Sequence, residues 1–246
     1  TLFIFHCSSD VGSEDILSDN SGNEGGGDFT GGSNQTIPEL TVELISTYNN
    51  QTASFATPYG SFMRNFIVHT PPNFDYQTES LPLLFVLHGY TGRATSIREY
   101  SGFDQIADEE RFIVVYVQGT TDLFDNTGWN VNVVASFLGV DDVGFFKALI
   151  KYFKASYNIE SNKIFSSGMS LGGFMSYRLA CQLEEINSIG SVTGSMAGYY
   201  QCNPPKKTSI IHFHGMNDAI VPYNGVEWSY SAKAAHDFWK NHNQCN

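Results

Sequence analysis

One serine in this 246-residue chain lies in a motif that could make it a nucleophile. Residues 163–173 read as a short apolar strand that ends in Gly168-Met169-Ser170-Leu171-Gly172 and passes into a helical pattern. A G-x-S-x-G motif between a strand and a helix is the context of a nucleophile elbow, a sharp turn that exposes the serine hydroxyl. Glycines at both ends let neighbouring backbone approach the turn closely. The pattern predicts Ser170 as a catalytic nucleophile, and the structural alternative is a Gly-rich turn.

A serine nucleophile needs a base, an acid that orients the base, and hydrogen-bond donors for the oxyanion. Where the serine lies in an elbow, the chain order is Ser, then Asp or Glu, then His. Asp218 follows the predicted strand 209–213, and open α/β sheets bind ligands at that end of their strands. We therefore predict Asp218 as the acid, with an Asx turn as the alternative. His88-Gly89-Tyr90 ends the apolar run 81–87 and is a loop of the type that supplies an oxyanion amide.

The rest of the chain must position these residues. Period-two alternation and apolar runs predict strands, and apolar steps of three and four predict helices. Strands are expected at 41–45, 62–68, 81–87, 112–117, 163–167, 189–193 and 209–213. Helices are expected at 103–110, 143–157 and 174–183, with a last one carrying Trp228 to Trp239, and 119–139 is expected to be a loop. Strands that alternate with helices predict one domain with a mainly parallel sheet covered on both faces. Asp141 and Asp142 are expected to cap the helix that they precede.

Charge and hydropathy exclude two classes of partner. The net charge is −12, but residues 1–63 hold eight acids and no Lys or Arg, which leaves 13 bases against 17 acids in the remainder. No basic patch indicates nucleic acid, and no apolar run approaches the roughly 20 residues of a membrane span.

The N-terminal residues resemble the tail of a bacterial lipoprotein signal peptide, closest to those of surface lipoproteins of Bacteroidetes-like bacteria. An apolar run ends in Cys7 and is followed by an acidic, Gly-rich tract. The resemblance implies that 1–7 is a signal remnant, that Cys7 is lipidated, and that the lipid is the protein's contact with the membrane. The alternative is an apolar fragment with an incidental thiol. Residues 8–38 then form a disordered tether, and 39–246 form the domain of an exported, cell-surface, periplasmic or secreted protein.

Several separated motifs occur in one order over residues 60–245. They are 88–89, 128–130, 140–145, 168–173, 177–181, 214–218 and 221–223. Together they resemble the secreted esterase family of feruloyl esterases and polyhydroxybutyrate depolymerases. The resemblance implies an α/β-hydrolase fold, Ser170 as nucleophile, Asp218 as triad acid, and the amides of Tyr90 and Leu171 as oxyanion hole. It also makes Trp129 a candidate substrate-contacting aromatic residue, with a packed core Trp as the equal alternative.

The histidine that completes the triad is not evident. In that family it follows one more strand, and this chain reaches Asn246 first, so we expect the fold to stop before its last strand. After Asp218 only His236 and His242 remain, both in the last helical pattern, and neither is expected to be the base. His212 and His214 are expected to be buried and hydrogen-bonded rather than a metal-binding pair, and no metal or other cofactor is predicted.

Cysteine spacing does not determine the disulfide pairing. If Cys7 is lipidated, three cysteines remain, an odd number for an exported protein. A bridge between Cys181 and Cys202 is compatible with their positions after consecutive elements, and a partner for Cys245 is then expected beyond residue 246.

The prediction is a secreted serine carboxylic-ester hydrolase that acts through an acyl-enzyme on feruloyl or acetyl esters of plant cell-wall polysaccharide. One alternative is a polyhydroxybutyrate-type polyester depolymerase. An alternative of another class is a non-catalytic polymer- or carbohydrate-binding relative that lacks the base. The sequence does not separate these substrates and is silent on the oligomeric state.

Overall fold

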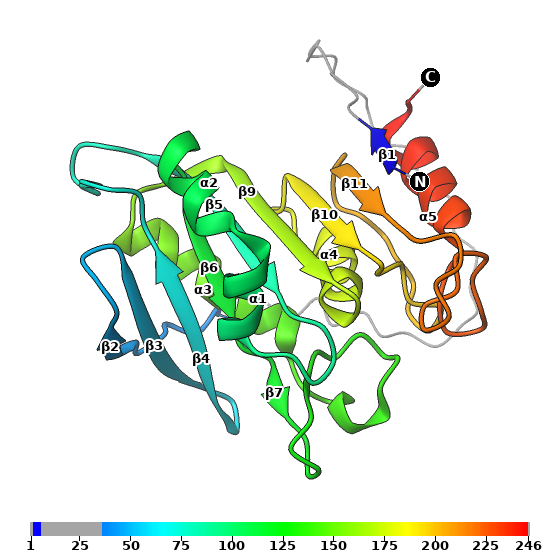
Figure 1. Cartoon of the computed structure of the whole chain (residues 1–246), viewed down its shortest axis with the longest axis horizontal. Coiled ribbons are helices and arrows are strands. Elements are labelled where there is room, and N and C mark those ends of the chain that lie inside the picture. Colours follow the sequence, from blue (N-terminus) through cyan, green and yellow to red (C-terminus); the bar gives the residue numbers. More distant parts are fainter. Residues whose placement is uncertain (1, 6–35, 246) are drawn as a thin grey trace.

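A nine-stranded sheet with helices on both faces forms the body of the protein (Figure 1). The computed structural model describes residues 2–5 and 36–245. The strands are β1 (Leu2–Phe5), β2 (Glu43–Thr47), β3 (Thr52–Tyr59), β4 (Phe62–His69), β5 (Leu81–Leu87), β6 (Ile113–Val117), β7 (Thr120–Thr121), β8 (Thr127–Gly128), β9 (Ile159–Met169), β10 (Ser188–Val192) and β11 (Ser209–Phe213). The helices are α1 (Ala94–Ser101), α2 (Phe103–Glu110), α3 (Asp142–Ser156), α4 (Leu171–Gln182) and α5 (Ala232–Asn243), with the 3₁₀ helix η1 (Ala135–Phe137).

The strand order is β1-β11-β10-β9-β5-β6-β4-β3-β2, and β7 and β8 form a separate pair. The central strands β6, β5, β9, β10 and β11 are parallel. Antiparallel strands flank them, with β4, β3 and β2 on one side and β1 on the other. The predicted mainly parallel sheet is confirmed for the centre, which is the part that positions the candidate site.

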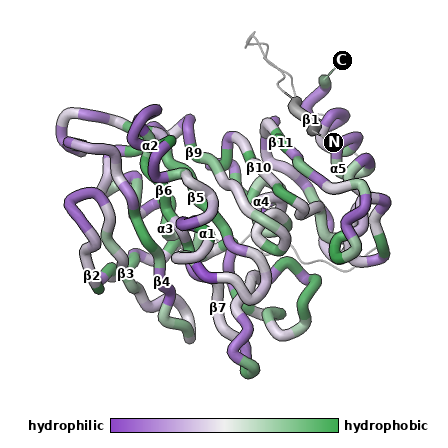
Figure 2. Tube along the Cα trace, in the orientation of Figure 1, coloured by the Kyte–Doolittle hydropathy of each residue, from purple (hydrophilic) through white to green (hydrophobic). Residues whose placement is uncertain are grey.

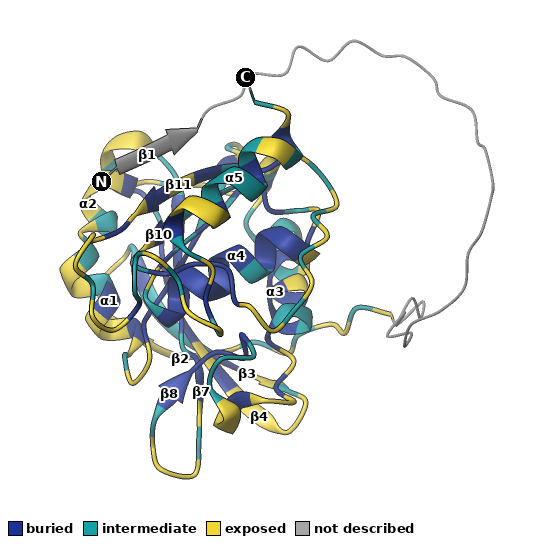
Figure 3. Cartoon of the chain, turned by 90° about the vertical axis from the view of Figure 1, so that its right-hand side faces the viewer, coloured by how far each residue is buried: buried dark blue, intermediate teal, exposed yellow. Residues whose placement is uncertain are grey.

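Alternate residues of the central strands enter two separate cores. In β5, Leu83, Phe85 and Leu87 pack in the core that includes α3 and α4, whereas Val86 packs in the core that includes α1 and α2. A strand covered on both faces reads as a continuous apolar run, which is why 81–87 could be predicted without alternation. Strands β5 and β6 are mostly hydrophobic (Figure 2), and buried residues fill the interior of the fold between the helices (Figure 3).

The carboxyl ends of the parallel strands meet at one edge of the sheet. The loop with Gly89 follows β5, Ser170 follows β9, and the loop with Asp218 follows β11. Two backbone hydrogen bonds tie the strand ends together, from Ser170 N to Val192 O (2.8 Å) and from Thr193 N to Phe213 O (2.8 Å). The residues proposed for chemistry therefore share one edge, where ligands bind in open α/β sheets.

Some elements differ from the expectation. The patterns did not predict β3 or α1, and the expected loop 119–139 holds β7, β8 and η1. The last helix begins at Ala232, so Trp228 precedes it and the predicted start was wrong. Ser231 caps this helix, because its hydroxyl accepts a hydrogen bond from Ala234 N (3.0 Å).

Most of the N-terminal predictions concern residues that the structure does not describe. Cys7 and residues 8–35 of the predicted tether lie outside the described residues, so lipidation and the tether stay predictions. Leu2–Phe5 pairs antiparallel with β11 as strand β1. None of the helices among residues 36–245 is long and apolar enough to cross a membrane.

Candidate active site

Ser170 occupies a strained turn between β9 and α4. Its φ of 52° and ψ of −120° are backbone angles that a residue with a Cβ rarely adopts, at a cost of about 1–3 kcal/mol. The turn is held because Ser170 N donates to Val192 O and Phe174 N donates to Ser170 O (3.1 Å). The surroundings thus force a half-buried serine into the geometry of a nucleophile elbow.

Two glycines bring the elbow against the loop after β5. A Cβ on Gly172 would lie 2.2 Å from the Leu87 carbonyl oxygen, so only glycine lets α4 start this close to the end of β5. A Cβ on Gly89 would lie 3.3 Å from Ser170 Cβ, which shows that this loop touches the serine. Close backbone approach explains why small residues recur on both segments.

The two predicted oxyanion donors flank this contact. Leu171 is the first residue of α4, where N–H groups have no intrahelical partner and the helix dipole favours negative charge. Tyr90 follows Gly89 directly, and its ring is 43% exposed and packs edge-on against Phe137 with 6.2 Å between centroids. Both amides therefore belong to segments in contact with Ser170.

His88 and Trp129 fasten the loop that carries Tyr90. The His88 Nε2 atom accepts hydrogen bonds from Gly119 N (2.9 Å) and the Gln118 amide (3.0 Å), so Nδ1 carries the proton and donates to Gly89 O (2.7 Å). Burial lowers the pKa of His88 to about 4, which keeps the ring neutral. Trp129 Nε1 donates to His88 O (2.9 Å).

Trp129 is a packed core residue. The side chain is 0% exposed and belongs to the core that contains α3 and α4. The prediction of a substrate-contacting aromatic residue was wrong, and the packed alternative holds. The pattern around 128–130 could not reveal this, because burial depends on elements far away in the sequence. Trp129 instead positions the backbone of the His88–Tyr90 loop.

A buried ion pair in turn holds the Trp129 loop. Asp142 Oδ1 lies 2.7 Å from Arg64 Nη2, and Asp142 Oδ2 accepts from Asn130 N (2.7 Å); both ionic side chains are 1% exposed or less. Arg64 also lies over the Phe145 ring, 4.1 Å from its centroid. The capping prediction is correct for Asp141, whose carboxylate accepts from Gly144 N (2.9 Å). For Asp142 it was incomplete, because this first-turn carboxylate is turned inward toward Arg64.

Asp218 lies in a turn after β11. Its Oδ1 accepts hydrogen bonds from Ile220 N (2.9 Å) and Val221 N (2.9 Å), which is the Asx-turn geometry. Its Oδ2 lies 3.9 Å from His214 Nε2, and the side chain is 16% exposed. One carboxylate oxygen thus fixes the loop while the other keeps lone pairs for a further donor.

Two stacked histidines, His212 and His214, support the Asp218 loop. The Tyr177 hydroxyl lies 2.7 Å from His212 Nδ1, His212 Nε2 lies 2.9 Å from His214 Nδ1, and His214 Nε2 donates to Val221 O (2.8 Å). The Val221 carbonyl can only accept, so each hydrogen bond in this series is donated in the direction from Tyr177 to Val221. Burial lowers the pKa of His212 to about 4. Both rings form part of a hydrogen-bonded core, as predicted, and among the described residues no group of three or more His, Cys, Asp or Glu could hold a metal ion.

The two histidines that follow Asp218 both lie on α5. His236 Nδ1 pairs with Asp237 Oδ1 (2.8 Å), and His242 Nε2 lies 3.0 Å from Lys206 O and is stacked on Phe238. Neither contact is with Ser170, and the prediction that neither is the base stays a prediction.

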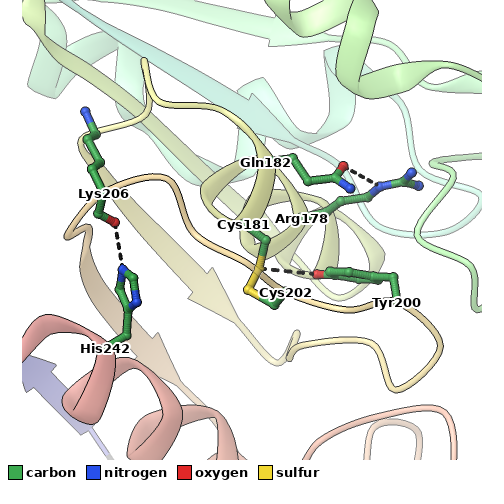
Figure 4. The surroundings of a disulfide bond; sticks show 7 residues. All are labelled: Arg178, Cys181, Gln182, Tyr200, Cys202, Lys206 and His242. Carbon is green, nitrogen blue, oxygen red and sulfur yellow. Dashed lines mark hydrogen bonds between the residues drawn. A yellow bond between two sulfur atoms is a disulfide. The ribbon is translucent and has the colours of Figure 1, made fainter. Parts of the chain in front are cut away.

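A disulfide joins Cys181 on α4 to Cys202, with 5.0 Å between their Cα atoms (Figure 4). It fastens the segment after β10 to the helix that begins at Ser170. Cys245 is also disulfide-bonded within this chain, so the expectation of a partner beyond residue 246 was wrong. Arg178, one turn before Cys181, hydrogen-bonds the Asn130 carbonyl and links this side of α4 to the Trp129 loop.

No protein-family model matches the chain. Over 206 residues it is 26% identical to a bifunctional acetylxylan esterase/xylanase of Neocallimastix patriciarum, a match that covers 80% of this chain and 26% of that protein. It is 27% identical over 167 residues to feruloyl esterase B of Piromyces equi, covering 66% of this chain and 30% of that protein. The chain thus spans less than a third of the length of either curated relative.

Among solved structures, a thermostable esterase superposes with a TM-score of 0.56 at 15% identity, over 84% of this chain and 53% of that one. Such a likeness concerns the fold. Together with the parallel centre of the sheet, it confirms the predicted α/β-hydrolase fold.

Proposed function

We propose that this chain belongs to a secreted serine carboxylic-ester hydrolase whose substrates are acetyl or feruloyl esters on plant cell-wall polysaccharide. The observation that carries the proposal is the strained Ser170, placed against the Gly89–Tyr90 loop at the carboxyl edge of the sheet. The similarity to an acetylxylan esterase and a feruloyl esterase supports the ester class. The disulfide between Cys181 and Cys202 supports an oxidising compartment outside the cytosol.

The proposed reaction uses Ser170 as nucleophile. Its Oγ attacks the ester carbonyl and loses its proton to a base, and the carbonyl oxygen becomes an oxyanion that accepts hydrogen bonds from the amides of Leu171 and Tyr90. The sugar hydroxyl leaves with the proton from the base, and water then releases the acid from the acyl-enzyme. Oxyanion donors of this kind contribute about 10²–10³-fold to kcat each.

Asp218 is the proposed orienting acid, because its Oδ2 faces away from the amides that hold Oδ1. No histidine is assigned as the base. The described histidines hydrogen-bond to other groups, and His236 and His242 do so on α5. We therefore expect slow turnover, since a serine hydroxyl without a base is a weak nucleophile.

Hydrolysis of p-nitrophenyl acetate by the whole chain tests the nucleophile. Ser170→Ala should reduce the protein-dependent rate to that of buffer, whereas Ser167→Ala, on the same strand, should leave it unchanged. An unchanged rate in Ser170→Ala would refute the assignment. Fast turnover that is lost in His236→Ala would show that the base is on α5. Methyl ferulate, acetylated xylan and polyhydroxybutyrate then separate the feruloyl, acetyl and polyester alternatives.

A second candidate is a polymer-binding relative without catalysis. The hydrogen bonding of the described histidines to groups other than Ser170 favours it. This candidate predicts binding to insoluble xylan with no difference between the parent chain and Ser170→Ala in ester hydrolysis. A Ser170-dependent rate would exclude it.

A further inference from the structure

A cleft with a mixed polar and apolar lining lies beside the candidate active site, and Arg93 and Gln118 line it at the same edge of the sheet. It has a volume of about 310 Å³, and its lining residues come from the start of α1, strand β4, the β2–β3 turn and the β7–β8 pair. The lining side chains used below are Tyr48, Asn65, Arg93, Thr95, Gln118 and Thr121. Tyr48, Asn65, Arg93, Thr95 and Thr121 are exposed.

The lining suits an uncharged, hydroxyl-rich chain. Arg93 is the one charged residue that lines the cleft, and the amide and hydroxyl side chains around it can both donate and accept hydrogen bonds. The Tyr48 ring is 54% exposed and has the Arg98 guanidinium 5.5 Å from its centroid. An exposed ring beside amides and hydroxyls matches the alternating apolar and polar faces of a sugar ring.

Hydrogen bonds make the cleft wall continuous with the oxyanion loop. Gln118 accepts from Ala94 N (2.9 Å) through Oε1 and reaches His88 through its amide nitrogen. On the other wall, Thr91 N donates to Thr127 O (2.8 Å), and the Thr127 hydroxyl donates to Gly92 O. The segment from His88 to Ala94 therefore lines the cleft at one end and contacts Ser170 at the other.

The distance between cleft and serine follows from the strand order. Gln118 follows β6 and Ser170 follows β9, and β5 lies between these strands. Two strand spacings of about 4.8 Å place the two positions about 10 Å apart along the edge. A polymer with its esterified sugar at Ser170 would reach the cleft with a neighbouring part of its main chain.

We infer that this cleft binds the main chain of the esterified polysaccharide, an uncharged β-linked glycan, next to the sugar that carries the ester. The inference rests on the proposed function. Asn65, Arg93 and Thr121 would donate to or accept from sugar hydroxyls, and Tyr48 would pack on a ring face. The cleft would then set the preference for polymer over small esters, without touching the reacting atoms.

Binding of xylohexaose to the whole chain tests this without requiring catalysis. Isothermal titration calorimetry should show binding that is weakened about fivefold by each of Asn65→Ala and Arg93→Met, because a net hydrogen bond contributes about 1 kcal/mol. Asn203→Ala, an equally exposed asparagine elsewhere, should bind as the parent does. Thermal unfolding of each variant checks that the fold is retained, and Thr121→Ala provides a second cleft variant if one of the others fails.

Three results would overturn the inference: no binding of xylohexaose, unchanged binding in all the cleft variants, or equal binding of α-linked maltohexaose. The Ser170→Ala variant separates this inference from the proposed function. If ester hydrolysis depends on Ser170 but xylohexaose does not bind, the cleft is wrong and the function stands. If xylohexaose binds through the cleft and no hydrolysis depends on Ser170, the catalytic proposal fails and the cleft stands.

Discussion

The buried pair of Arg64 and Asp142 is the most sensitive point of the scaffold behind the candidate site. Asp142→Asn keeps the shape of the side chain and an oxygen for the Asn130 amide, but it leaves the Arg64 charge with no carboxylate 2.7 Å away. Arg64 Nε already has no hydrogen-bond partner among the described residues. The remaining compensation is the Phe145 ring at 4.1 Å, which cannot replace a full negative charge.

The expected loss in the free energy of unfolding is large. Removing one partner of a buried ion pair costs about 3–5 kcal/mol, because the other charge stays buried without compensation. A domain has a free energy of unfolding of about 5–15 kcal/mol, so Asp142→Asn should lose about a fifth of it or more. Urea unfolding followed by tryptophan fluorescence should show a lower midpoint with an unchanged slope.

Two further variants test whether the uncompensated charge of Arg64 causes the loss of stability. Asp141→Asn changes the neighbouring, exposed carboxylate, and since asparagine is also a good N-cap, its cost should stay below about 1 kcal/mol. The double variant Arg64→Met with Asp142→Asn removes both charges, keeps an oxygen for the Asn130 amide, and should recover most of the stability. The reasoning fails if Asp142→Asn is as stable as Asp141→Asn, or if the double variant is no more stable than Asp142→Asn.

Two other predictions concern the same scaffold. The Cys181–Cys202 disulfide closes a loop with a sequence separation of 21, so replacing both by Ser should lower the free energy of unfolding by about 3 kcal/mol in urea titrations, and an unchanged midpoint would contradict this. His88 and His212 are neutral with pKa values lowered by burial to about 4, so below pH about 6.5 the unfolded chain binds more protons than the folded one. The free energy of unfolding should therefore fall between pH about 6.5 and about 4, by up to about 3 kcal/mol per group, and a curve that is flat over this range would show that the rings are not buried as neutral bases.

The sequence predicts best what depends on local backbone geometry. The elbow at Ser170 is specified within a few residues, because a strand, a turn that needs glycines and a helix follow one another directly. Strands β5 and β6 were also predictable, because burial on both faces leaves an apolar run. By contrast, α1 is short and mostly polar, with Ala94 and Ile97 as its buried residues, so it offers too few apolar positions to reveal a helical spacing.

Side-chain roles that depend on distant elements could not be predicted. Trp129 and Asp142 have the residue types expected of a substrate contact and a helix cap, yet both face inward. What turns them is a partner from another part of the chain, His88 O for the indole and Arg64 for the carboxylate. The spacing from 128 to 142 carries no trace of either partner. Sequence motifs thus predict where a site would lie, but they did not predict the buried roles of Trp129 and Asp142.

The histidines of β11 have a structural role that agrees with the chain order expected of a triad. His212 and His214 precede Asp218, and the hydrogen-bonded chain from Tyr177 to Val221 uses both rings to hold the loop in which Asp218 lies. A ring that must donate to the Val221 carbonyl is constrained by the core and cannot also turn toward Ser170. Asp218 Oδ1 accepts from the Ile220 and Val221 amides, and Oδ2 lies 3.9 Å from His214 Nε2. The two buried histidines therefore hold the loop of Asp218, and the proposed function requires a base from another segment.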